Sequence, residues 1–194
     1  LAEPGERIAI YVGRLAPEKQ VEDLKVVHDL EGVRLVIVGE GPERDMLERV
    51  LPEARFVGFR SGKDLATHLA SADLFVHPGE LETFCQTIQE AMASGIPAIA
   101  PRIGGPVDLI APSQTGWLYT PGNLDELREH VKDLMFDDAK RQAFGLAAQD
   151  SVRKRTWPVL AEQLMGYYEQ AIADQARVNL AIDKSGSMSR LWGE

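Results

Sequence analysis

Short runs of apolar residues recur along the chain, as in RIAIYV at residues 7–12 and VRLVIV at residues 33–38. A strand with one wet face would alternate apolar and polar residues, so these continuous runs predict parallel strands that are buried on both faces of a sheet. The same reasoning predicts further strands over residues 55–57, 73–76, 96–100 and 116–119.

The segments between these runs carry apolar residues three or four positions apart, which predicts helices. Pro17 is expected to open a helix, and Asn123 to cap another, because Glu126 follows it as in a capping box. The expected helices cover residues 17–30, 43–51, 64–70, 124–135, 138–154 and 157–177, with one more that starts within Thr83-Phe84-Cys85. This alternation predicts an α/β fold, a single Rossmann-like domain with a six-stranded parallel sheet and extra C-terminal helices.

The two ends of the chain differ in composition from the middle. Residues 1–6 are polar and contain Pro4-Gly5, so we expect a linker remnant there. The Rossmann-like domain with its C-terminal helix is expected over residues 7–176, and residues 177–194, which include SGSMS, are expected to be a tail. The last helix has an apolar stripe that favours packing into a core, formed by Leu160, Leu164, Tyr168 and Ile172.

Composition narrows the class of protein. A hydrophobic fraction of 44% and a charged fraction of 26% are typical of a soluble globular domain. The net charge of -9 argues against a nucleic-acid-binding protein, which needs clustered Lys and Arg. The single cysteine, Cys85, excludes an internal disulfide and fits a reducing compartment. No apolar run approaches the ~18 residues of a membrane span and no signal peptide opens the chain, so we expect a cytoplasmic location, with peripheral contact at the inner face of the membrane left open.

Residues 77–110 hold most of the side chains that could form a binding site. If Glu82 and Glu90 lay on one helix, their carboxylates would be about 12 Å apart and within about 80° of one face. The N–H groups of Phe84 to Gln86, at the expected helix start, would attract a phosphate between them. This order of groups suits the hydroxyls, diphosphate and hydroxyls of a nucleotide sugar. Two solvated surface glutamates are the alternative on local sequence, but the preceding strand favours a site, because open α/β sheets bind ligands at this edge.

Two cations follow the first expected strand. Arg14 could grip a diphosphate with its planar guanidinium, and Lys19 could neutralise it as a point charge. Two solvated surface cations are the alternative.

Other kinds of site have little support. The four histidines lack the spacing of metal ligands, so no metal site is predicted and the imidazoles, His77 included, are expected to be exposed or hydrogen-bonded. Ser94 and Ser151 have no histidine near them in sequence, so no nucleophilic triad is indicated.

Several of these residues together resemble one enzyme family. Glu82-Thr83-Phe84, the run EAMASGIP from Glu90, and Gly104-Gly105 are similar to the E-x7-E signature of the retaining glycosyltransferases of family 4, whose GT-B architecture has two Rossmann-like domains. The longer run ETFCQTIQEAMASG, followed by GGPVDLI, is similar to actinobacterial α-mannosyltransferases that use GDP-mannose. The resemblance covers residues 7–168.

The resemblance implies a role for each matching residue. Glu90 would hold the ribose, and Glu82 with the amides of Phe84, Cys85 and Gln86 would hold the sugar hydroxyls. The diphosphate would lie against Gly13, Arg14 and Lys19, and the base near Phe59 and Arg60, although an ordinary loop is the alternative there. Glu82, Arg14 and Lys19 would be the catalytic residues. Three residues depart from the family pattern: Gln20 and Cys85 replace glycines, and Asp108 replaces glutamate. Cys85 could narrow the pocket.

By this resemblance, the chain is the C-terminal, donor-binding half of a GT-B glycosyltransferase that transfers a hexose, mannose from GDP-mannose being the closest match, to an acceptor hydroxyl. It implies a metal-independent enzyme without a cofactor, a missing N-terminal acceptor domain, and little activity for this chain alone. A lipid acceptor reached through that domain, and a homodimer, stay open. The alternatives are a noncatalytic nucleotide-sugar-binding module and a sugar-nucleotide epimerase of the same fold.

Overall fold

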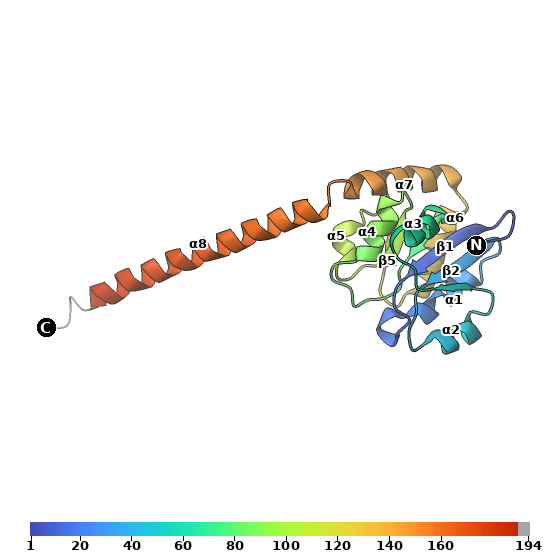
Figure 1. Cartoon of the computed structure of the whole chain (residues 1–194), viewed down its shortest axis with the longest axis horizontal. Helices are drawn as coiled ribbons and strands as arrows, with labels where there is room; N and C mark the ends of the chain where they lie inside the picture. Colours follow the sequence, from blue (N-terminus) through green and yellow to red (C-terminus); the bar gives the residue numbers. More distant parts are fainter. Residues whose placement is uncertain (190–194) are drawn as a thin grey trace. The chain divides into compact units, whose positions relative to one another are not determined.

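A parallel sheet of six strands forms the centre of the fold (Figure 1). The computed structural model describes residues 1–189 and, beyond residue 179, their backbone only. The strands lie in the order β3-β2-β1-β4-β5-β6, and every neighbouring pair is parallel, as the sequence predicts. Their bounds are Arg7–Val12 (β1), Val33–Val38 (β2), Arg55–Gly58 (β3), Leu74–Val76 (β4), Ala98–Pro101 (β5) and Gly116–Tyr119 (β6). The order reverses between β1 and β4, and at such a point the loops after the two strands diverge and leave a crevice.

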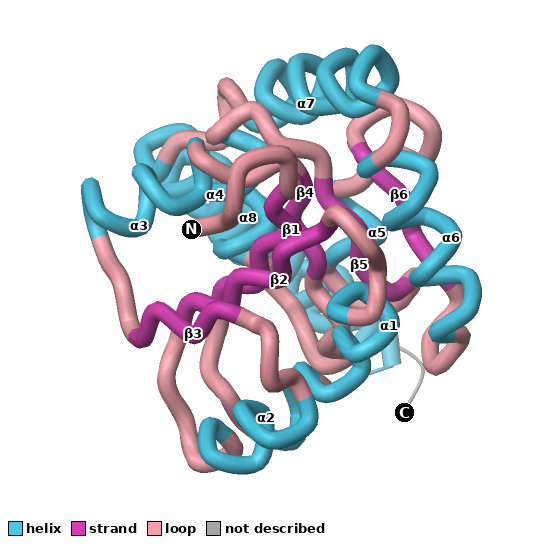
Figure 2. The backbone as a smooth tube through the Cα atoms, turned by 90° about the vertical axis from the view of Figure 1, so that its right-hand side faces the viewer, coloured by secondary structure: helices cyan, strands magenta, loops and turns pink. Residues whose placement is uncertain are grey.

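Helices cover both faces of the sheet, and each face has its own core (Figure 2). One core joins the sheet to α1 (Lys25–His28), α2 (Arg44–Val50) and α6 (Leu124–Met135). The other joins it to α3 (Gly62–Ala70), α4 (Gln86–Ala93) and α7 (Asp138–Val152). Along β1, Ala9 and Tyr11 enter the first core while Ile8, Ile10 and Val12 enter the second. Both faces of the strand are therefore dry, which is why its sequence is continuously apolar.

The prediction of a single helix over residues 17–30 is wrong. The segment is divided into two 3₁₀ turns, Pro17–Lys19 (η1) and Val21–Leu24 (η2), followed by the single α-turn α1. Gln20, between the two 3₁₀ turns, has left-handed backbone angles of φ 50° and ψ 35°. A left-handed residue ends the helical path, so an apolar pattern that suits one helix is distributed over three short pieces.

The remaining boundaries differ from prediction by small amounts, apart from α5 and α8. The short helix α5, Pro106–Leu109, was not predicted. Asn123 caps α6 as expected, accepting a hydrogen bond from the Glu126 amide at 3.2 Å.

The chain divides into two units, residues 1–153 and 154–194. The second contains α8, Trp157–Ser189, which is longer than the helix predicted to end near residue 177 and includes the SGSMS segment that was expected in a tail. Residues 177–184 contain no proline or glycine, so nothing in them stops the helix. Its stripe residues Leu164, Tyr168 and Ile172 are exposed rather than packed in a core. The last part of the predicted tail, residues 190–194, lies outside the described residues.

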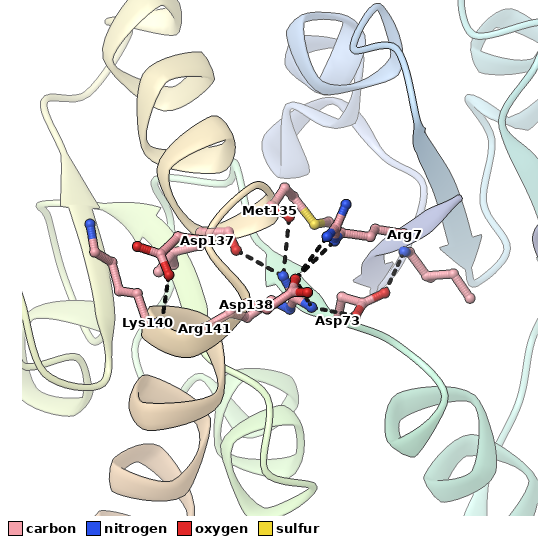
Figure 3. Close-up of polar contacts among 9 residues, drawn as sticks. Arg7, Asp73, Met135, Asp137, Asp138, Lys140 and Arg141 are labelled. Carbon is pink, nitrogen blue, oxygen red and sulfur yellow. Dashed lines mark hydrogen bonds and ion pairs between the residues drawn. The ribbon is translucent and has the colours of Figure 1, made fainter. Parts of the chain in front are cut away.

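A cluster of charges fastens the amino-terminal ends of the strands to the α6–α7 corner (Figure 3). The Arg141 guanidinium lies 3.3 Å from Asp73 and 2.9 Å from Asp138, and it donates to the carbonyl oxygens of Leu134 and Met135. Asp138 also pairs with Arg7 of β1 at 2.8 Å, and Asp73 accepts from the Ile8 amide just before β4. This cluster lies at the edge opposite the carboxyl ends of the strands.

Removing the Arg141 side chain tests how much this cluster contributes to stability. Only 11% of the side chain is exposed, so Arg141→Ala takes one buried donor from two carboxylates and two carbonyl groups, and leaves Asp138 with Arg7 and Asp73 with the Ile8 amide. We expect the free energy of unfolding to fall by about 2–4 kcal/mol in urea denaturation. Arg49→Ala, which removes an exposed arginine of α2, is the matched control and should change it by less than about 0.5 kcal/mol. Equal stability of both variants would contradict this account.

Candidate functional site

A cavity of about 670 Å³ lies at the carboxyl ends of β1, β2 and β3. Gly13 and Arg14 contribute from the loop after β1, and Gly39 and Glu40 from the loop after β2. Parallel strands bring their carboxyl ends to the same edge, so residues distant in sequence meet here. The other lining residues are Val12, Val38, Phe59, Arg60, Ser61, Gly62, Leu65, Gln86, Thr87 and Glu90.

Glycines let the first two loops pack backbone against backbone. A Cβ added to Gly39 would lie 1.8 Å from the Gly13 carbonyl oxygen, and one added to Gly41 would lie 2.1 Å from the Leu15 oxygen. Gly39 also has φ 149°, which disfavours other residues. The Leu15 amide donates a hydrogen bond to the Glu40 backbone carbonyl oxygen at 3.0 Å, which links the two loops. Arg14 is thereby fixed at the cavity's edge, where its guanidinium pairs with Glu18.

The helix α4 supplies the far wall of the cavity. It begins at Gln86, with Cys85 as its N-cap in a left-handed conformation, φ 55°. Among the amides predicted to cradle a phosphate, only that of Gln86 lies in the first helical turn, and the Phe84 amide precedes the helix. The first-turn N–H groups are those of Gln86 to Ile88, which have no acceptor within the helix. Glu90 faces the cavity one turn further on and accepts a hydrogen bond from the Gln86 side chain at 2.9 Å.

The condition of one helix that carries both carboxylates is not met, because α4 begins after Glu82, close to the start expected within Thr83-Phe84-Cys85. The Glu82 carbonyl oxygen accepts from the Gly105 amide at 2.8 Å, so it does not serve as a helical acceptor. A Cβ on Gly105 would lie 2.1 Å from the Thr83 carbonyl oxygen. The loop that contains Gly104 and Gly105, called the glycine loop below, therefore touches the backbone of residues 82–85. That contact accompanies a loop at residues 82–85, whose Glu82 side chain faces Lys19 and His77.

Glu82 instead belongs to a second cluster, with Lys19 and His77. Its carboxylate pairs with the Lys19 ammonium and lies 3.3 Å from His77 Nε2. The His77 imidazole first, and then Lys19, hold the pKa of Glu82 at about 2, against partial desolvation that would raise it. Glu82 is therefore ionised across the physiological range.

His77 does not match the expectation of an exposed or hydrogen-bonded imidazole. The side chain is 3% exposed and stacks on the rings of Tyr11 and Phe75. Among the residues described, neither ring nitrogen has a hydrogen-bond partner of regular geometry, although Nε2 lies 3.3 Å from the Glu82 carboxylate. Its position after β4 was the one signal in the sequence for this role.

The Cys85 side chain points away from the cavity. It is 3% exposed and belongs to the core under α4. Burial raises the pKa of the thiol to about 12, so it is protonated and unreactive in the folded state. Cys85 is not among the residues that line the cavity, so its side chain does not narrow it, contrary to the expectation.

The ten residues predicted to form the site thus separate into groups. Six line the cavity, namely Gly13, Arg14, Phe59, Arg60, Gln86 and Glu90. Lys19 and Glu82 form the neighbouring cluster, Phe84 is exposed, and Cys85 is buried.

Sequence reasoning missed eight cavity residues, namely Ser61, Gly62, Leu65, Thr87, Val12, Val38, Gly39 and Glu40. The first three form the β3–α3 connection and the start of α3. That connection follows a strand at the carboxyl edge, which was the available signal.

Two searches of the described residues were negative. No group of three or more His, Cys, Asp or Glu side chains is placed to hold a metal ion in the described part of the chain. None of the helices described here has the length and apolar character that crossing a bilayer requires.

Comparisons with known proteins give consistent matches. The family model for glycosyl transferases group 1 matches residues 1–151. The GDP-mannose-dependent alpha-mannosyltransferase of Mycolicibacterium smegmatis is 51% identical over 169 residues, which are 87% of this chain and 44% of that protein.

Two solved structures align with a similar fraction of this chain. Sucrose-phosphate synthase from Thermosynechococcus elongatus gives a TM-score of 0.77 at 27% identity, over 87% of this chain and 46% of that one. HepE from Anabaena, solved in complex with UDP, gives 0.75 at 25% identity, over 86% and 49%. The chain therefore spans less than half the length of each of these three proteins.

The low pKa of Glu82 makes stability depend on pH. Because the folded value, about 2, lies below the ordinary 4.5, the carboxylate stabilises the fold above about pH 4.5, and this contribution is lost as the pH falls toward 2. We expect Glu82→Gln to be less stable than the wild type by about 1–3 kcal/mol near neutral pH, with a smaller difference below about pH 4.5. Urea unfolding over this range measures it. The control Glu129→Gln alters an exposed carboxylate and should have little effect. A pH-independent difference for Glu82→Gln would contradict the assignment.

The contact between the glycine loop and residues 82–85 is tested by Gly105→Ala. The added Cβ would meet the Thr83 oxygen at 2.1 Å and the Cys85 sulfur at 2.7 Å, so one loop must move. We expect a loss of about 2 kcal/mol or more in the free energy of unfolding and faster alkylation of Cys85 by iodoacetamide. Gly166→Ala is the control, since nothing lies within 4 Å of its added Cβ. Unchanged alkylation in Gly105→Ala would mean that the loops are not in contact in solution.

Proposed function

Because the chain belongs to the glycosyl transferases group 1 family, we propose that it forms the nucleotide-sugar-binding part of a retaining glycosyltransferase that transfers mannose from GDP-mannose to an acceptor hydroxyl. The observation that carries the proposal is the cavity in which Arg14, the first turn of α4 and Glu90 face one another at the carboxyl edge of the sheet. The choice of donor is supported by the 51% identity to a protein named as a GDP-mannose-dependent alpha-mannosyltransferase.

In this proposal each end of the cavity takes one part of the donor. Glu90 accepts hydrogen bonds from the ribose hydroxyls, and the base lies against Phe59 and Arg60, which line the same cavity. The diphosphate lies between Arg14 and the start of α4, where open N–H groups and the helix dipole favour an anion. Glu82 and Lys19, just outside the cavity, meet the sugar and the phosphate bound to it.

Donor binding then requires an exchange of ion pairs. In the structure Arg14 pairs with Glu18, and Lys19 pairs with Glu82. A diphosphate competes with these carboxylates for the two cations, and Glu82, once released, accepts hydrogen bonds from sugar hydroxyls. The low pKa of Glu82 means that it enters this exchange as a carboxylate, which accepts hydrogen bonds and donates none.

The same cations stabilise the leaving group. As the bond between sugar and diphosphate breaks, negative charge grows on the departing phosphate oxygen. Arg14, Lys19 and the α4 dipole lie where that charge develops, and they neutralise it without a metal ion in this proposal. Each contact that strengthens in the transition state is worth about 2–4 kcal/mol of barrier.

The acceptor is assigned to a part of the protein outside this chain. The matched region is 44% of the mycobacterial relative, which leaves room for a second domain that binds the acceptor and closes the site. Cytoplasmic location, an acceptor in the membrane and dimer formation belong to that whole protein and are part of the same hypothesis.

Calorimetric titration with GDP, UDP, ADP and GDP-mannose tests the donor site. We expect selective binding of GDP and GDP-mannose, weakened about tenfold or more by Arg14→Ala and by Glu90→Gln, because one charge-assisted contact is worth about 1.5–3 kcal/mol. Arg49→Ala and Glu129→Gln are matched controls on the surface and should bind like the wild type.

The full-length protein with the same substitutions provides the second arm. If the full-length protein transfers mannose and Arg14→Ala slows that transfer, the proposal is supported. Donor binding without any transfer would indicate a noncatalytic module. Wild-type affinity in both site variants, in the chain and in the full-length protein, would refute the assigned site.

A further inference from the structure

Gln20 occupies an unfavourable backbone conformation beside the Lys19–Glu82 pair. Among the described residues other than glycine, three have positive φ, and two of them, Gln20 and Cys85, flank this cluster. A left-handed turn at Gln20 costs free energy that glycine would not incur. No side-chain cap is formed with the neighbouring 3₁₀ turns, so local structure gives no reason for a long polar side chain here.

The side chain of Gln20 reaches across to another loop. Its Oε1 accepts a hydrogen bond from the Glu80 amide at 3.0 Å, in a partly buried position. Glu80 lies two residues before Glu82, in the loop that follows β4. The contact therefore joins the loop that carries Lys19 to the loop that carries Glu82.

The two loops also touch at Gly79. A Cβ added to Gly79 would lie 3.3 Å from the Lys19 Cα and 3.4 Å from the Glu18 oxygen. Beyond Glu82, the Gly105 amide fixes the other end of the loop through the Glu82 carbonyl. Gln20 thus holds the near end of a loop whose far end is held by the glycine loop.

We infer that Gln20 is a positioning residue, whose Oε1 holds the Glu80 amide and so fixes the separation between the two loops that carry Lys19 and Glu82. The inference rests on the proposed function, in which Lys19 meets the phosphate and Glu82 the sugar. A ligand that bridges both groups needs that separation, whereas a nucleoside diphosphate, which lacks the sugar, does not. Gln20 therefore favours nucleoside diphosphate sugars over nucleoside diphosphates.

Three substitutions at residue 20 separate the hydrogen bond from the backbone strain. Gln20→Met keeps length and strain but removes the acceptor, and Gln20→Glu keeps an acceptor at the same reach. Gln20→Gly removes both the acceptor and the strain. If the role were only structural, affinity would follow stability, and Gln20→Gly would bind GDP-mannose more tightly than Gln20→Met.

The first measurement is hydrogen exchange of the Glu80 amide in the 194-residue chain by NMR. Gln20→Met should raise the exchange rate about tenfold or more, and Gln20→Glu should restore protection. Because no ligand is needed, this arm judges the contact between the loops even if the wild type binds no nucleotide. Equal exchange in the wild type and Gln20→Met would overturn the inference.

The second measurement compares GDP with GDP-mannose by calorimetry. Gln20→Met and Gln20→Gly should both lower the affinity for GDP-mannose about tenfold and change the affinity for GDP by less than about twofold. This loss should occur in Gln20→Gly even though that variant unfolds at an equal or higher urea concentration than Gln20→Met. Gln20→Glu should bind GDP-mannose more tightly than Gln20→Met. Unchanged GDP-mannose affinity in Gln20→Met refutes the positioning role, whereas a wild type that binds neither ligand refutes the proposed function instead.

Discussion

Backbone-to-backbone contact between loops holds the carboxyl edge of the sheet in shape. Gly39 lies against the Gly13 carbonyl, Gly105 against that of Thr83, and Gly79 against the backbone of Lys19. At Gly39 and Gly105 even a methyl group would overlap a backbone oxygen, so the loops after four different strands can approach only where side chains are absent. The placement of Arg14, Lys19 and Glu82 follows from these contacts, since each side chain is carried by a loop that another loop fixes.

At this edge of the sheet, the two cations assigned to the site are already paired with carboxylates of the same chain. Arg14 and Lys19 each have a carboxylate partner within a chain of net charge -9. The free energy of binding an anionic ligand is then the difference between the ion pairs that form and those that break, so breaking the existing pairs lowers the affinity. Under the proposed function, this arrangement would lower the maximum affinity, keep the site ordered and ease release of a charged product.

Sequence patterns predicted the sheet well because buried parallel strands give a strong local signal. Arg7–Val12, Val33–Val38 and Gly116–Tyr119 have the predicted bounds, and the comparisons confirm both the fold and the glycosyltransferase resemblance. The errors at residues 17–30 and at the start of α4 share one cause, which is contact between loops distant in sequence, whereas α8 passes its predicted end because residues 177–184 contain no proline or glycine. The turn at Gln20 is held by Glu80, and the start of α4 is set by Gly105. The family resemblance grouped Arg14 with Glu90, and both line the cavity, but the ion pairs and the buried His77 could not be read from local spacing.

The single cysteine has a consequence for observing this edge in motion. Cys85 is the residue where the loop enters α4, and its sulfur is enclosed between that helix and Gly105. With a pKa near 12 and almost no exposure, it cannot react while the loops are closed. Every modification of this thiol therefore records one local opening of the loop, so the native chain already contains its own chemical reporter, and no label has to be introduced to time that motion.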